Sequence, residues 1–135
     1  MPGNIATIYL PLNTYAMVRC VTNAAFRQQI TITPETGSPT VVTGSGEHDA
    51  PVPNGTFAIQ TPGSSTNPLG YKVTVAVQSD NGSGGWTPSQ VSQGSCSVMY
   101  YNLAMVVSED YVDNDWNDAV VQFTWWTPPS ARMVR

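Results

Sequence analysis

Short apolar runs alternate with turn-forming stretches along the whole chain. Residues 71–78 show the pattern most clearly, because apolar residues from Tyr71 to Val77 occupy every second position and mainly polar residues lie between them. Seven further runs have a strand-like composition and are short: residues 6–10, 15–22, 28–33, 39–43, 56–60, 97–107 and 119–126. Turn-forming residues gather between them, at residues 44–47, 53–56, 61–70 and 80–85. This spacing predicts an all-β sandwich of short strands.

Length and composition favour one folded domain. The chain has 135 residues, of which 41% are hydrophobic and only 10% are charged, which is unlike a coiled coil or a disordered acidic chain. Its 11 glycines and 11 prolines oppose long helices. No apolar run approaches the roughly 18 residues that cross a bilayer, and the first residues lack the features of a secretory signal. We therefore expect a soluble protein without membrane insertion, whose location the sequence leaves open.

The acidic residues are unevenly distributed. A net charge of −4 argues against nucleic acid as a partner. Five of the nine acidic residues fall within residues 109–118, a segment without Lys or Arg. Apolar runs flank this segment at residues 103–107 and 119–126, so we expect a loop that joins two strands. Because carboxylates this close together repel one another, the loop indicates a bound cation.

The acidic loop contains the oxygen donors that calcium prefers, and it contains no His or Cys that would favour zinc or copper. Residues 113–117 imitate the start of an EF-hand loop, but Asp118 stands where that loop requires Gly and Thr124 where it requires Glu. Two ions are possible, since a carboxylate can bridge them. An acidic surface turn without metal and a purely structural calcium site are the alternatives. The candidate ligands are Glu109, Asp110, Asp113, Asp115, Asn117 and Asp118.

One long segment resembles a known family. It has Ser-Glu-Asp at residues 108–110 and Asp-Asn-Asp-Trp-Asn-Asp at residues 113–118, and it continues into an apolar strand that ends at Trp125. This order is similar to the signature of the calcium-dependent bacterial lectins that bind fucose and mannose. Residues 8–14 and 21–26 resemble the first strand and the sugar-specificity region of that family. The resemblance implies an antiparallel β-sandwich domain over residues 1–127 and a C-terminal extension over residues 128–135.

The resemblance also implies two calcium ions per chain, with Asp115 and Asp118 bridging them. The implied ligands of one ion are Glu109, Asp113, Asp115 and Asp118, and those of the other are Asn23, Asp115, Asn117 and Asp118.

Sugar recognition is implied in the same way. In lectins of this family two sugar hydroxyls coordinate both ions, and nearby acids accept hydrogen bonds from the same hydroxyls. The corresponding acids are Asp110, Asp113, Asp115 and Asp118. The specificity loop corresponds to Ala24, Ala25 and Phe26. Because Ala at the first of these positions accompanies mannose preference in the family, whereas Ser accompanies fucose, Ala24 implies that mannose is preferred.

The C-terminus departs from the family pattern. Family chains commonly end in a Gly whose carboxylate reaches the second calcium of a partner subunit, whereas this chain continues beyond Pro128. Another oxygen replaces that ligand, or the dimer is rearranged, or the second site is weak. The resemblance still implies a homodimer or higher homo-oligomer.

We therefore predict a non-enzymatic, calcium-dependent lectin that binds mannose- or fucose-containing glycans. The alternative is a calcium-stabilised structural or adhesive β-sandwich without sugar binding. A glycosidase is a weaker hypothesis, because its two carboxylates would be committed to metal. His48 is expected to be a lone, exposed loop residue, and no motif supports a Ser/His/Asp hydrolase. Cys20 and Cys96 are either free thiols or a disulfide.

Overall fold

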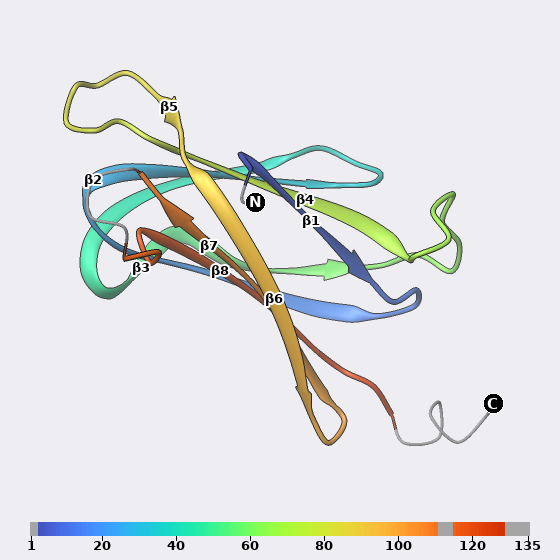
Figure 1. Ribbon diagram of the computed structural model, residues 1–135. Coiled ribbons are helices and arrows are strands. Elements are labelled where there is room, and N and C mark those ends of the chain that lie inside the picture. Colours follow the sequence, from blue (N-terminus) through green and yellow to red (C-terminus); the bar gives the residue numbers. More distant parts are fainter. Residues whose placement is uncertain (1–2, 111–114, 129–135) are drawn as a thin grey trace.

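The fold consists of β-strands joined by turns and loops. A computed structural model of the chain describes residues 3–110 and 115–128. No helix occurs among these residues, and therefore none that could cross a membrane. The strands are β1 (Ile5–Leu10), β2 (Tyr15–Pro34), β3 (Thr40–Gln60), β4 (Tyr71–Ser79), β5 (Thr87–Pro88), β6 (Gln90–Val98), β7 (Tyr101–Glu109) and β8 (Ala119–Trp126) (Figure 1).

All eight strands belong to one antiparallel sheet. Its order is β1-β4-β2-β8-β7-β6, with β3 paired to β2 and β5 paired to β4. The two edge strands approach each other where Gly3 forms a bridge with Val91. Nearby, the Gln93 side-chain amide donates to the Thr7 carbonyl (2.7 Å) and accepts from the Thr7 N–H (3.0 Å). The sheet is therefore nearly closed in a barrel-like arrangement, and the prediction of an all-β antiparallel fold is confirmed.

The prediction that every strand is short is wrong for the middle of the chain. β2 has 20 residues and β3 has 21, and each joins two of the expected runs. Residues 44–47 and 53–56, which we expected to be turns, lie inside β3. Gly46, His48, Asp49 and Asn54 adopt positive φ angles (122°, 64°, 54° and 59°) in this part of β3. Pairing with β2 nevertheless continues, with register shifts at bulges. Turn-forming residues here bend a strand without ending it.

The expected strand at residues 97–107 is also wrong. The chain turns at Met99 and Tyr100, so that β6 and β7 form a hairpin in which Val98 pairs with Tyr101. Met99 has a φ of 55°, a conformation unusual for a residue other than Gly or Asn. Because neither Met99 nor Tyr100 is a turn-forming residue, the sequence contains no turn signal at this point. Most of β6 is polar and exposed, which explains why its first half was not predicted as a strand.

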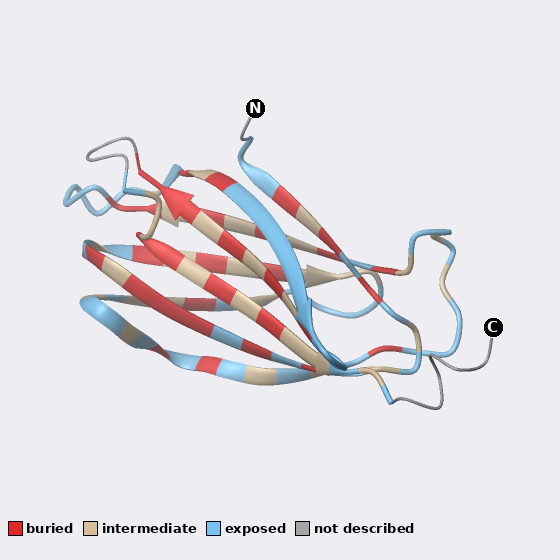
Figure 2. Cartoon of the chain, turned by 60° about the horizontal axis from the view of Figure 1, so that its bottom comes forward, coloured by how far each residue is buried: buried red, intermediate tan, exposed pale blue. Residues whose placement is uncertain are grey.

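The core lies inside the curled sheet, and buried residues alternate with more exposed ones along most strands (Figure 2). Val73, Val75 and Val77 are buried as the pattern of residues 71–78 predicts. Phe123 of β8 is among the largest fully buried side chains. The two cysteines are free: Cys20 is buried on β2, whereas Cys96 is exposed on β6. His48 is exposed, as expected, but it lies within β3 and not in a loop.

Several buried polar residues lie at one end of the barrel. Thr22, Gln28, Ser79, Ser89 and Ser108 are all less than 2% exposed. They come from β2, β4, β7 and the β5–β6 connection, near the points where these strands approach the β7–β8 loop or the β4–β5 connection. Both loops emerge at this end of the molecule (Figures 1 and 2). Of these residues, Ser108 contacts the end of the acidic loop directly, because its carbonyl and hydroxyl oxygens accept from the N–H groups of Asp118 and Ala119.

Candidate functional site

The acidic cluster forms where two neighbouring strands end. Glu109 is the last residue of β7, and Asp118 directly precedes β8. Because β7 and β8 are paired up to Val107 and Val120, their ends lie side by side. Glu109 and Asp118 are only 2% and 3% exposed, and Asp110 is 8% exposed. A strand pair therefore places three carboxylates against the interior of the protein.

Main-chain hydrogen bonds hold these carboxylates in place. The Asp110 N–H donates to Asp118 Oδ2 (2.9 Å), and the Trp116 N–H donates to Glu109 Oε1 (3.0 Å). The Asp118 N–H donates to the Ser108 carbonyl (3.2 Å). The Ser108 hydroxyl accepts from the N–H of Ala119 (2.9 Å). The described parts of the loop are therefore ordered by contacts with their own strand ends.

The oxygen atoms of the cluster fit a hard cation. Ligand oxygens of Glu109, Asp115 and Asp118 all lie within 4.8 Å of one another. Calcium binds oxygen at about 2.3–2.6 Å, so two oxygens on opposite sides of one ion are roughly 5 Å apart. All three carboxylates can thus contact a single ion. With its amide nitrogen turned toward Asp115, Asn117 donates hydrogen bonds to both carboxylate oxygens of that residue (2.9 and 2.7 Å). The Asn117 carboxamide therefore also lies at the cluster.

The electrostatics of the cluster favour a bound cation. Burial, together with the negative charges of Asp110 and Glu109, raises the pKa of Asp118 to about 8. A carboxyl group in this environment is neutral at pH 7 unless a positive charge compensates for it. A divalent cation provides that compensation at short range. The chemistry of this donor set matches calcium better than a transition metal, since every ligand is an oxygen.

The structure brings together most of the predicted metal ligands. Glu109, Asp115, Asn117 and Asp118 gather at the cluster, with Asp110 beside them. Asp113 lies outside the described residues. Asn23 is adjacent through its main chain, whose N–H donates to the Asp118 carbonyl (3.0 Å).

The side chain of Asn23 is bonded to β3. Its Nδ2 donates to Asp49 Oδ1 (2.9 Å), and its Oδ1 accepts from the Asp49 N–H (2.8 Å). A carboxamide oxygen can accept a second interaction, so Asn23 keeps one lone pair for a cation. Sequence reasoning did not find Asp49, because its contact with Asn23 depends on the long β3 strand that the turn-forming residues concealed.

The segment that corresponds to the specificity loop lies on a bulge of β2. Ala24 pairs with Gly46, but the next residue of β2 that pairs with β3 is Gln28, opposite Gly44. Ala24 is buried, Ala25 is exposed and Phe26 is half-buried. The bulge therefore lifts Ala25 and Phe26 out of the regular sheet next to Asn23.

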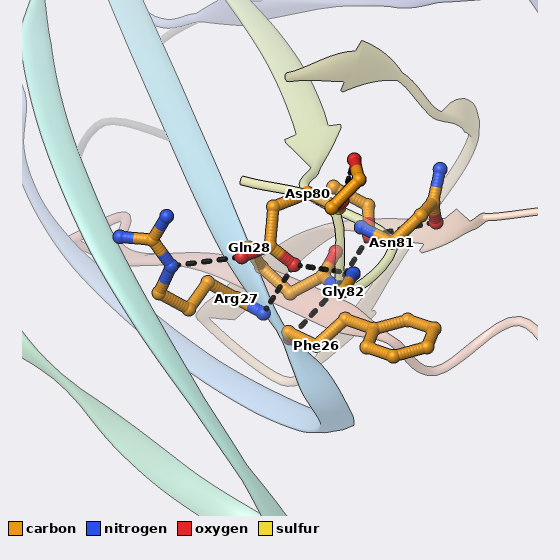
Figure 3. A network of polar contacts seen from close by, with 8 residues as sticks. Phe26, Arg27, Gln28, Asp80, Asn81 and Gly82 are labelled. Atoms are coloured by element: carbon orange, nitrogen blue, oxygen red, sulfur yellow. Dashed lines mark hydrogen bonds and ion pairs between the residues drawn. The ribbon is translucent and has the colours of Figure 1, made fainter. Parts of the chain in front are cut away.

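The β4–β5 connection contains functional candidates that sequence reasoning missed. A Cβ atom added to Gly82 would lie 3.0 Å from the Phe26 ring, so Phe26 packs directly on this connection. Asp80 of the same connection pairs with Arg27, which directly follows the specificity segment (Figure 3). The Asp80-Asn-Gly sequence signals a turn, but no local pattern indicates that this turn meets Arg27.

The chain is similar to known proteins over most of its length. A family model described as fucose-binding lectin II (PA-IIL) matches residues 8–127. A solved Ralstonia solanacearum high-affinity mannose-binding lectin is 27% identical, with 90% of this chain and 96% of that chain covered and a TM-score of 0.67. The Chromobacterium violaceum lectin CV2L, solved in complex with alpha-methyl-fucoside, is 26% identical, with the same coverage of 90% and 96% and a TM-score of 0.68.

A third solved structure shares the fold. The C-terminal domain of the BC2L-C lectin from Burkholderia cenocepacia is 24% identical, with 95% of this chain and 100% of that chain covered and a TM-score of 0.71. No curated protein matches the chain.

Proposed function

The chain belongs to the fucose-binding lectin II (PA-IIL) family and is a carbohydrate-binding lectin. From this premise we propose that it binds the mannose- or fucose-type ends of glycans in a calcium-dependent manner, through two ions per chain, with mannose preferred. The observation that supports calcium dependence most directly is the convergence of Glu109, Asp115 and Asp118. Their oxygens lie within 4.8 Å of one another, at the buried end of two strands.

The proposed ligands divide into two groups. Glu109, Asp113, Asp115 and Asp118 would hold one ion, and Asn23, Asn117 and the two bridging aspartates, Asp115 and Asp118, would hold the other. Bound calcium would supply free coordination positions for two neighbouring hydroxyls of the sugar. Asp110 and the bridging aspartates orient the sugar by accepting hydrogen bonds from the same hydroxyls. The Asp110 N–H donates a hydrogen bond to Asp118, so the proposed sugar-binding residue Asp110 is tied directly to the proposed metal ligand Asp118.

The preference for mannose rests on the specificity segment. Ala24 is a small, buried residue next to Asn23, and it offers no hydroxyl to the sugar. The similar Ralstonia protein is described as a mannose-binding lectin, and the Chromobacterium lectin was solved with a fucoside. Both sugar classes therefore belong in the test.

The site is proposed to bind without catalysis. Glu109 and Asp118 are 2% and 3% exposed, and both accept main-chain hydrogen bonds within their own loop. Glycoside hydrolysis requires two carboxyl groups that reach opposite sides of a glycosidic bond. In the proposed site both carboxylates would be committed to metal, so neither would be available for that role. Release of a labelled leaving group from mannosides or fucosides would contradict this part of the proposal.

A homodimer or higher homo-oligomer would increase the avidity of such sites for glycan-coated surfaces. Apolar side chains are exposed around the β6–β7 turn, among them Met99, Tyr101 and Trp126. Tyr101 and Trp126 are paired across β7 and β8, so they form part of one surface. A second copy of the chain would cover this surface. Light scattering tests the assembly, and a monomer that agglutinated cells would contradict it.

The central test is thermal unfolding of metal-stripped protein in EDTA, in excess calcium, and in calcium with mannose, fucose or galactose. We expect calcium to raise the melting temperature, and mannose to raise it further than fucose, because ligands that bind only the folded state stabilise it. In EDTA the sugars should have no effect. A rise with calcium alone would favour the structural alternative.

Matched variants make the test specific. Asp115→Asn removes an exposed carboxylate of the cluster and should remove most of the calcium shift. Glu47→Gln removes an exposed carboxylate of β3 outside the cluster and should leave the shift unchanged. Equal shifts in the two variants would contradict the assignment of the site.

A further inference from the structure

Arg27 is held rigidly by the β4–β5 connection. Its Nε donates to Asp80 Oδ2 (2.8 Å), and its main-chain N–H donates to Asp80 Oδ1 (3.2 Å). In return the Asp80 N–H donates to the Arg27 carbonyl (3.1 Å). Figure 3 shows these two residues at the centre of a polar network that also includes Gln28 and Gly82. Three hydrogen bonds therefore join one residue of β2 to one residue of the loop.

The partners of Arg27 are themselves fixed. Asp80 is 6% exposed, and its Oδ1 also accepts from the Gly82 N–H (3.0 Å). Trp86 lies against the guanidinium group, whose carbon is 5.1 Å from the ring centroid. Asp80 thus holds one edge of the guanidinium group, and the carbon of that group lies over the Trp86 ring. An arginine restrained in this way loses little further entropy when it binds a ligand.

The terminal nitrogens of Arg27 are directed away from Asp80 (Figure 3). Among the described residues, the hydrogen bonds that the Arg27 side chain donates come from Nε alone, and the side chain is 53% exposed. Both terminal amino groups therefore have donors available in a fixed orientation. Such a pair of donors suits a carboxylate or two neighbouring hydroxyl oxygens.

The position of Arg27 relates it to the sugar site. It follows Ala24, Ala25 and Phe26, and the preceding Asn23 is bonded to Asp118. Four residues of extended chain span at most roughly 13–14 Å, and the bulge shortens this distance. Phe26 packs against Gly82 on the same loop that holds Arg27. Arg27 thus lies just beyond the segment expected to contact the terminal sugar.

We propose that Arg27 and Trp86 form a subsite for the sugar unit that is linked to the terminal, calcium-bound sugar. The terminal N–H groups of Arg27 donate to oxygen acceptors of that second unit, and Trp86 and Asp80 hold the guanidinium in position. A uronic acid would be bound most tightly, because its carboxylate accepts charge-assisted hydrogen bonds, and a neutral sugar would offer hydroxyl oxygens to the same donors. This inference rests on the proposed function of the terminal-sugar site.

Calorimetric titration of the calcium-loaded protein tests the subsite with three ligands: methyl α-mannoside, a dimannoside, and a disaccharide of mannose linked to glucuronic acid. Arg27→Ala should leave the affinity for methyl α-mannoside within about twofold, and should lower the affinity for the acidic disaccharide about tenfold. A smaller loss is expected for the dimannoside. Arg19→Ala, which removes an exposed arginine elsewhere on β2, should leave all three affinities unchanged.

The possible outcomes separate the hypotheses. A loss of affinity confined to the two disaccharides supports the subsite. A larger loss for the acidic disaccharide identifies a carboxylate as the acceptor, and a larger loss for the dimannoside identifies a hydroxyl. Equal losses for the monosaccharide and the disaccharides, or no loss at all, would overturn it. If Arg27→Ala does not fold, Arg27→Gln removes the charge while keeping a polar side chain, and it should still lose the preference for the acidic disaccharide. Failure of the unchanged protein to bind methyl α-mannoside and methyl α-fucoside would instead refute the proposed function.

Discussion

Replacing Asp118 by Asn is the most informative perturbation of the acidic cluster. Asp118 is 3% exposed, and burial together with the charges of Asp110 and Glu109 raises its pKa from 3.8 to about 8. Asn imitates the neutral carboxyl group, and its side-chain oxygen can still accept the hydrogen bond from the Asp110 N–H. Asp118→Asn therefore removes the charge with little change in shape.

The expected effect without calcium is an increase in stability. Because the folded-state pKa lies above the unfolded-state value, the contribution of Asp118 to stability is complete below about pH 4 and is lost as the pH rises toward 8. At pH 7 the loss amounts to about 1.4 kcal/mol for each of roughly three pH units, or of order 4 kcal/mol. In EDTA, Asp118→Asn should thus unfold at higher urea than the unchanged protein at pH 7, and at nearly the same urea at pH 4.

Calcium should stabilise the unchanged protein much more than Asp118→Asn. A ligand at 100 times its dissociation constant stabilises a protein by about 2.7 kcal/mol, and only the unchanged protein retains the Asp118 carboxylate for the ion. Urea unfolding followed by tryptophan fluorescence, with and without calcium, measures both quantities. If Asp118→Asn is less stable than the unchanged protein in EDTA at pH 7, the account of charge repulsion is refuted. If it gains as much from calcium, Asp118 is not a ligand.

Asp80→Asn provides the matched control. Asp80 is also buried, but its hydrogen bond with Arg27 holds its pKa below the usual value. Its contribution to stability is therefore present at pH 7 and is lost as the pH falls through the lowered pKa. Asp80→Asn should destabilise the protein at pH 7 both with and without calcium, and its gain from calcium should be unchanged.

Three further predictions concern the fold. Phe123→Ala should lower the free energy of unfolding by about 3–5 kcal/mol in urea titrations, because Phe123 is fully buried, and a loss below about 1 kcal/mol would contradict its place in the core. In the folded protein a thiol reagent should label exposed Cys96 but not Cys20, because burial raises the pKa of the Cys20 thiol to about 12. Unfolding should make Cys20 reactive as well, and rapid labelling of both thiols in the folded protein would refute the prediction. Gly70→Ala should lower the free energy of unfolding by about 1–3 kcal/mol, because Gly70 has a φ of 126° and a Cβ there would lie 2.6 Å from the Leu10 carbonyl oxygen. Gly94→Ala is the control: a Cβ there meets open space, so the same titration should show almost no change.

The sequence by itself was sufficient for the fold class and the acidic cluster. Alternation of apolar residues identified β4 and the core positions of that strand, because side chains of a strand point to opposite faces at every step. The density of acids in residues 109–118 identified the cluster, and the order of residues 108–125 identified the family. These features are local, so they can be recognised without a three-dimensional structure.

Strand lengths could not be predicted as reliably. The chain continues as strand through residues 44–47 and 53–56 because pairing with β2 compensates for unfavourable φ angles at His48, Asp49 and Asn54. The chain turns at Met99 although that residue has no turn preference, because the β6–β7 ladder pairs Val98 with Tyr101 and so fixes the two ends of the turn. In both cases cross-strand hydrogen bonds outweigh local propensity.

Tertiary structure alone decided which distant residues meet at the site. Arg27 and Asp80 are far apart in the sequence, and their pairing depends on the register in which β2 and β4 place Gln28 opposite Ser79. The contact between Asn23 and Asp49 likewise depends on the bulged pairing of β2 with β3. Register is a collective property of the whole sheet, set by the burial of one face of every strand, so no local pattern encodes these contacts.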